Sequence, residues 1–139
     1  MTAPLYTTEI LRLAASLPEP VELERVDGSA SQRSSTCGST VSTMVQLGDG
    51  RVEALSQKVH ACAFGQASAA LLERHAFGSA HDDISQALIL LSRWLAEEQE
   101  DPGGWPGIVA LEAARKRKAR HGAILLPFRA LLAAIEAAP

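Results

Sequence analysis

The clearest regular pattern in the chain is an alternation of apolar and polar residues in its first half. Between residues 41 and 47 every second side chain is valine, threonine or leucine, which is typical of a strand with one buried face. Gly48-Asp49-Gly50 follows, and residues 51–60 form a second candidate strand. An Asp-Gly pair between two such runs predicts a tight hairpin. A shorter apolar run, residues 21–26, predicts a further strand, and the small polar residues 28–35 predict a loop.

The rest of the chain has apolar residues at helical spacing. The predicted helices cover residues 8–17, 66–75, 79–98, 108–114 and 122–137. Ser79 and Asp82 form a capping box for the third of these, and Pro127 is expected to kink or restart the last, because proline has no backbone N–H. Strands early and helices late predict one α+β domain over residues 1–139, with a small three-stranded antiparallel sheet and helices packed mainly on one face.

Composition narrows the class of protein. The chain has 139 residues, 47 % of them hydrophobic, which suffices for a core without disulfides. Its 13 Lys+Arg and 16 Asp+Glu give a net charge of −3, so nothing in the overall charge attracts nucleic acid or an anionic membrane. No apolar run approaches the roughly 18 to 20 residues of a membrane span, and the first ten residues lack a signal-peptide pattern. We therefore expect a cytoplasmic protein whose cysteines are free thiols, metal ligands or core residues.

The predicted hairpin places the candidate chemistry at its open end. If the Asp-Gly pair is a two-residue turn, the numbers of facing residues sum to 99, so Ser39 faces His60 and Cys37 faces Cys62. Facing Cβ atoms lie about 4.5 to 5.5 Å apart, close enough for two thiolates to share one ion or to form a disulfide. Thiolates and imidazole suit zinc or iron-sulfur chemistry rather than Ca²⁺ or Mg²⁺. A buried role for both cysteines, as small hydrophobic residues, stays open at this point.

Three segments resemble, in order, the cysteine motifs of one protein family. They are Thr36-Cys37-Gly38-Ser39 before the hairpin, residues 60–69 (HACAFGQASA) after it, and residues 120–131 (RHGAILLPFRAL). The chain resembles the U-type iron-sulfur cluster assembly scaffolds, namely the IscU and SufU proteins and the N-terminal domain of NifU. In that family a Cys-Gly-Asp precedes the hairpin and a Gly-Cys-Ala-x-x-x-Ala-Ser follows it. The resemblance covers about residues 30 to 135.

The resemblance implies a non-enzymatic scaffold. Such a protein receives persulfide sulfur from a cysteine desulfurase, builds an iron-sulfur cluster on its thiolates and passes it to cluster-accepting proteins. Cys37 and Cys62 match the family's first two cysteine ligands. Ser39 stands where the family has its metal-binding Asp, and Ala123 stands where it has the third cysteine. The full ligand set of the family is therefore not present in this chain.

The reduced ligand set implies a degenerate site for iron, zinc or a transient iron-sulfur cluster. His60 or His121 is a candidate third ligand beside the two cysteines, with water, a partner or a second subunit completing four-coordination. Ser39 occupies a metal position but is a poor ligand, and a turn role explains it as well. We expect the isolated protein to hold metal substoichiometrically or not at all.

Two other functions stay open. The chain is alternatively an interaction module that has kept the scaffold fold and modulates a desulfurase or a true scaffold, or a thiol-redox protein using a Cys37–Cys62 disulfide. The basic run 115–120 (RKRKAR) has no interleaved aromatic residue, which favours a solvated or partner-docking segment over nucleic-acid binding. The sequence contains no GxSxG, phosphate-binding glycine loop or HExxH motif.

Overall fold

The chain folds into a sheet covered on one face by helices. The computed structural model describes residues 6–35 and 38–139. Its elements are, in order, α1 (Thr8–Ala15), β1 (Gly28–Arg33), β2 (Thr40–Gly48), β3 (Arg51–His60), α2 (Ala63–His75), α3 (His81–Leu95), the 3-10 helix η1 (Ile108–Ala114) and α4 (Lys118–Glu136). The strands form an antiparallel sheet in the order β1-β2-β3. The predicted α+β fold with a three-stranded antiparallel sheet is confirmed.

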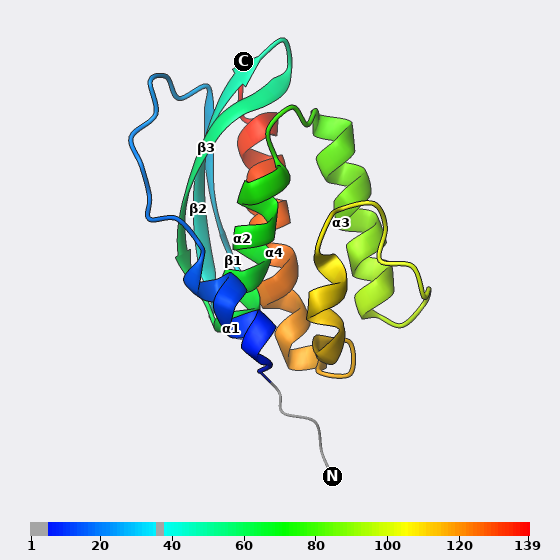
Figure 1. Cartoon of the computed structure of the whole chain (residues 1–139). Helices are drawn as coiled ribbons and strands as arrows, with labels where there is room; N and C mark the ends of the chain where they lie inside the picture. The colour runs from blue at the N-terminus through cyan, green and yellow to red at the C-terminus, as the bar shows by residue number, and fades with distance from the viewer. Residues whose placement is uncertain (1–5, 36–37) are drawn as a thin grey trace.

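The helices form two layers beside the sheet (Figure 1). α4 packs on β1 and β2, α2 packs on β3 and on α4, and α3 packs on α4 from the side away from the sheet. Phe128 of α4 is fully buried and meets Trp105 edge to face, with ring centroids 5.3 Å apart. The indole N–H of Trp105 donates to the carbonyl oxygen of Leu71 in α2 at 3.0 Å. Within the described residues, none of the helices combines the length and apolar character needed to cross a bilayer.

The β2–β3 hairpin contains one extra residue on β3. Asp49 and Gly50 both have positive φ, 53° and 76°, the conformation that a two-residue hairpin turn requires. Leu47 faces Val52 as the two-residue turn demands, but the register shifts between Gln46 and Leu47, and Gln46 faces Ala54. Glu53 is therefore a β-bulge residue, and every pair beyond it is displaced by one position.

The bulge changes which residues meet at the open end of the hairpin. Thr40, and not Ser39, faces His60, so the predicted pairing of Ser39 with His60 is wrong. The sequence gives no local signal for this bulge, because Glu53 fits a regular strand as well as a bulged one. The predicted pairing of Cys37 with Cys62 lies outside the described residues.

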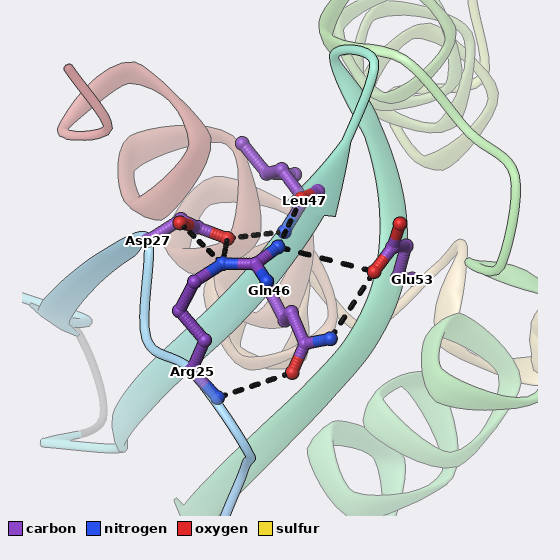
Figure 2. A network of polar contacts seen from close by, with 5 residues as sticks. All are labelled: Arg25, Asp27, Gln46, Leu47 and Glu53. Carbon is purple, nitrogen blue, oxygen red and sulfur yellow. Dashed lines mark hydrogen bonds and ion pairs between the residues drawn. The ribbon is translucent and has the colours of Figure 1, made fainter.

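A network of hydrogen bonds and ion pairs joins the residues around the bulge (Figure 2). The Leu47 N–H donates to Asp27 Oδ2 at 2.7 Å, and Arg25 Nη2 donates to the Leu47 carbonyl oxygen at 2.6 Å. Arg25 Nε also donates to both Asp27 oxygens, and this pairing holds the pKa of Asp27 below its ordinary value. Gln46 accepts from the Arg25 N–H and donates to Glu53. The backbone groups of Leu47 at the irregularity thus have partners.

The predicted strand at residues 21–26 is wrong, and so is the predicted loop at 28–35. Residues 21–26 lie along the sheet as irregular chain, with Val21 54 % and Val26 48 % exposed, so pairing would bury little. Gly28 begins β1 where α4 crosses the sheet closely, and a Cβ there would collide with the Ala134 carbonyl oxygen. Small residues form this strand because tertiary contact with α4 overrides their low strand propensity.

Most helix boundaries also differ from the expected ones by a few residues: α1 ends at Ala15 and not at 17, α2 begins at Ala63 and not at 66, and α3 ends at Leu95 and not at 98. α3 begins at His81, with Ala80 as the N-cap residue, and the Asp83 carboxylate accepts from the Ala80 N–H at 2.9 Å. The capping pair therefore lies one residue later than Ser79 and Asp82. α4 begins at Lys118 and continues through Pro127 without a restart.

His81 links the start of α3 to the end of α4 in a pH-dependent manner. Its Nε2 lies 2.9 Å from Glu136 Oε2 and its Nδ1 lies 3.1 Å from Asp82 Oδ1, and both contacts raise the pKa of His81 above its ordinary value. Because the pKa of His81 is higher in the folded state, its protonation stabilises the fold. This stabilisation is fully present below the unfolded pKa of about 6.5 and is lost as the pH rises through the folded pKa. His81→Gln is therefore expected to lower Tm at acidic pH and to leave it nearly unchanged at alkaline pH.

Thermal unfolding of the parent and His81→Gln on both sides of the titration measures this difference. Glu136→Gln is the matched control, because it removes the same ion pair from the other side and should show the same pH dependence. An equal loss of Tm at both pH values would show that His81 acts through packing and not through its charge.

Candidate cysteine site

Cys62 lies at the turn between the end of β3 and the start of α2. It is the N-cap residue of α2, with extended backbone (φ −67°, ψ 173°), and its half-buried side chain is a free thiol that makes no capping bond. The Gln66 N–H donates to the Cys62 carbonyl oxygen at 2.9 Å, and Gln66 Nε2 donates to the Ala61 carbonyl oxygen at 3.0 Å. Gln66 thus fixes the backbone turn while the thiol remains available for chemistry.

The first turn of α2 lies directly against α4 at Ala123. A Cβ on Gly65 would lie 3.3 Å from the Cβ and 3.2 Å from the carbonyl oxygen of Ala123, which is fully buried. One turn further along α2, the buried Ser68 hydroxyl donates to the Ile124 carbonyl oxygen at 2.6 Å. The position that resembles the family's third cysteine therefore packs against the helix turn that follows Cys62.

The loop that holds Cys37 joins β1 to β2. Thr36 and Cys37 lie outside the described residues, whereas the residues around them are bonded to each other: the Ser34 N–H donates to the Ser39 carbonyl oxygen at 2.9 Å, and the Gly38 N–H donates to the Ser34 carbonyl oxygen at 3.1 Å. Ser39 is only 6 % exposed. The loop ends beside Thr40, which faces His60, so it meets the sheet at the same end as Cys62.

The two candidate histidine ligands lie in different environments. Val59 packs with the buried side chains of α4, so the neighbouring His60 points to the opposite face of the sheet, where it is exposed. His121 is half-buried, and its Nε2 lies 2.8 Å and 3.0 Å from the carbonyl oxygens of Ala114 and Arg115. Because carbonyls only accept, Nε2 carries the proton, and Nδ1 is the ring nitrogen left for a ligand.

These side chains do not form a complete metal site by themselves. Across residues 6–35 and 38–139, no three His, Cys, Asp or Glu side chains come together in an arrangement that can hold an ion. Cys62, His60 and His121 are thus not one cluster.

Sequence reasoning missed the part of Gly65, Gln66 and Ser68 in positioning the site. The signal for it was present in the Ala-x-Gly-Gln-x-Ser spacing, since a glycine and a serine three residues apart share one helix face.

Known structures place this arrangement in a class. No protein-family model and no curated protein matches the chain. The fold, however, is that of a putative iron-sulfur cluster assembly scaffold protein for the SUF system from Fervidobacterium islandicum AW-1, with a TM-score of 0.84 over 94 % of this chain and 96 % of that chain at 16 % identity. The chain therefore shares the fold of that protein.

A second solved structure defines the family. The crystal structure of a nitrogen-fixing NifU-like protein (N-terminal) from Brucella abortus is 33 % identical, with a TM-score of 0.87 over 95 % of this chain and 92 % of that chain. The chain belongs to the NifU-like N-terminal domain family, which confirms the resemblance seen in the cysteine motifs.

Gly65 is expected to tolerate no side chain. In Gly65→Ala the new Cβ lies 2.6 Å from the Ala61 Cβ and 3.3 Å from the Ala123 Cβ, so the first turn of α2 must shift from Ala61 and from α4, at an expected loss of about 1–3 kcal/mol of unfolding free energy. Urea unfolding measures this loss. The matched control is Gly104→Ala, where a Cβ meets nothing within 4 Å, and its stability should stay within about 0.5 kcal/mol of the parent. Equal stability of the two variants would contradict the close approach of Gly65 to Ala61 and Ala123.

Proposed function

We propose that this chain is a scaffold-like protein of iron-sulfur cluster assembly that carries sulfur, iron or a transient cluster as cargo on Cys37 and Cys62. The observation that carries the proposal is the position of Cys62, a half-buried free thiol at the turn into α2, beside the α4 turn that contains Ala123. Membership of the NifU-like family supports the same assignment. The protein is a carrier in this proposal and catalyses no turnover of its own.

Two thiolates determine what kind of carrier this is. Zinc and iron in thiolate sites take four ligands, so Cys37 and Cys62 leave positions for other donors. His60 and His121 both stay candidate third donors; His60 is exposed and makes no ring hydrogen bond within the described residues, but it points to the sheet face opposite α4. His121 offers only Nδ1, and Ser39 is buried in the β1–β2 loop, where we assign it a structural role. A site so open should bind its cargo weakly and release it readily.

A second function is favoured by two observations. Ala123 is fully buried where the family has its third cysteine, and no three-ligand group exists in the described part of the chain. Both facts fit an interaction module that keeps the scaffold shape and modulates a cysteine desulfurase or a complete scaffold without binding metal.

One set of loading experiments separates these functions. The protein is reconstituted anaerobically with iron and sulfide, then desalted and measured by visible absorption and metal analysis. In parallel it is incubated with a cysteine desulfurase and cysteine, and intact mass reports added sulfur. The carrier function requires bound iron or added sulfur in the parent and its loss in Cys62→Ala and Cys37→Ser. A parent that retains no more iron and sulfur than a variant lacking both cysteines would establish the interaction module instead.

A further inference from the structure

Four cationic side chains lie around the start of α4. We call Lys116, Arg117, Lys118 and Arg120 the basic cluster. Residues 115–120 hold five of the chain's 13 Lys+Arg, so this segment is strongly positive. The chain as a whole is negative, because it has 16 Asp+Glu. None of the four forms an ion pair with any residue in the described ranges.

Arg115 shows what a structural cation in this segment does. Its Nε donates to the Trp94 carbonyl oxygen at 2.8 Å, its Nη2 donates to the Gln99 carbonyl oxygen at 2.9 Å, and its guanidinium lies 5.0 Å from the centroid of the Trp94 ring. The basic cluster makes no such contacts through its side chains within the described part.

The position of the cluster is unfavourable for the fold itself. Lys118 is the first residue of α4, Arg117 is its N-cap residue, and the first turn contains no acidic residue. A helix start carries a positive partial charge, so cations there are disfavoured and carboxylates are preferred. The basic cluster therefore does not stabilise α4, and its charge is available to a binding partner.

The basic cluster lies at the same end of the molecule as Cys62. Arg120 precedes Ala123 by three residues and so lies on the same side of α4, and Ala123 packs against Gly65, three residues after Cys62. Figure 1 shows the starts of α2 and α4 together at this end, beside α1 and opposite the β2–β3 turn.

Exposed apolar side chains occur on the elements next to the cluster. Val109 of η1 is 61 % exposed and Leu11 of α1 is 51 % exposed, and η1 and α1 pack against each other. Exposed apolar groups beside unpaired cations are the composition of a protein interface with a polar rim.

We propose that the basic cluster docks an acidic surface of the protein that exchanges sulfur or cluster with Cys62. The exchange partner rests on the proposed function, whereas the docking chemistry rests on the charges alone. A protein fits better than a nucleic acid, because residues 115–121 contain no aromatic side chain for base stacking. Opposite charges at this end would raise the rate of encounter and orient the partner toward the thiol.

Thiol exchange at Cys62 provides a direct test. The probe is a peptide of eight glutamates ending in a cysteine whose sulfur carries thionitrobenzoate as a mixed disulfide; the comparison peptide has glutamines instead. In the Cys37→Ser variant of the full chain, the Cys62 thiolate attacks the peptide sulfur, the old S–S bond breaks, and coloured thionitrobenzoate leaves. We expect the glutamate peptide to react at least about tenfold faster than the glutamine peptide at low salt. The preference should vanish near 1 M salt, where exposed charges interact only over about 3 Å.

Two triple variants with the same change in net charge locate the effect. Lys116→Gln with Arg117→Gln and Lys118→Gln should abolish the preference for the glutamate peptide. The control is Lys58→Gln with Arg93→Gln and Arg129→Gln. It removes three exposed cations outside the basic cluster that also form no ion pair in the described part, and it should retain the preference for the glutamate peptide. Equal loss in both, or no preference in the parent, overturns the proposal. Stronger competition by a single-stranded DNA of equal charge than by octaglutamate would assign the cluster to nucleic acid instead.

The outcome is independent of the loading experiments. A charge preference at Cys62 without iron or sulfur loading would retain the docking surface and replace the carrier by the interaction module. Loading without a charge preference would retain the carrier and withdraw the docking surface. The Tm of the cluster variant is a check on folding and should equal or exceed that of the parent, since the cations at the start of α4 are unfavourable.

Discussion

Ser39→Asp combined with Ala123→Cys is expected to raise the affinity of the protein for Zn²⁺ at least tenfold, equivalent to about 1.4 kcal/mol. The aspartate adds a negative charge and an oxygen ligand, and the cysteine adds a thiolate. The structure supports the choice of position 123, because its Cβ lies beside Gly65 in the first turn after Cys62. Titration against a competing chelator measures the affinity of the parent and the double variant.

The control for this gain is Cys62→Ala in the same double variant. Two cysteines then remain where the proposed zinc site needs three, so the added affinity should disappear. Equal zinc affinity of the parent and the double variant would mean that positions 39 and 123 do not face the two native cysteines. The correspondence with the family's Asp and third cysteine would then be withdrawn for those positions.

Phe128→Ala is expected to lower the unfolding free energy by about 3–5 kcal/mol, the range observed when a buried phenylalanine is truncated. Phe128 is fully buried between the helix layers and loses its edge-to-face contact with Trp105. Urea unfolding followed by circular dichroism measures the loss.

The matched control is Phe77→Ala, which removes the same atoms from a side chain that is 78 % exposed. Its unfolding free energy should stay within about 0.5 kcal/mol of the parent. A small loss in Phe128→Ala would indicate that the contact between α4 and the Trp105 segment contributes little, and that the core is concentrated nearer the sheet.

Local signals in the sequence predicted most of the fold. The alternation in 41–47 and the Asp-Gly turn identified β2 and β3 because both depend on neighbouring residues only. β1 escaped prediction because Gly28 and its small neighbours form a strand through a distant partner, α4. The valines of residues 21–26 predicted a strand that does not form, and the fold leaves their side chains largely exposed.

The candidate site was predictable only in part. The motif around Cys62 located the turn into α2, and the segment around Ala123 indicated the helix that packs there. The predicted pairing of Ser39 with His60 was wrong because counting from the turn assumes that every residue is paired, and the bulge at Glu53 adds one unpaired residue. The proton on His121 Nε2 depends on the carbonyl oxygens of Ala114 and Arg115, at the end of η1, which no local pattern reveals.

The bulge at Glu53 makes β3 one residue longer than the part of β2 that it pairs with. Without Glu53, Leu47 would still face Val52 and Gln46 would still face Ala54, so the ladder would be regular from the turn to the cysteine end. Deletion of Glu53 should therefore leave the cysteine end in place along β2. Deletion of a paired residue of β3 beyond the bulge would instead move that end by about 3.3 Å or turn buried side chains to solvent. The bulge is thus the one position in the paired part of β3 where the chain can lose a residue without changing which residues meet at the cysteine end.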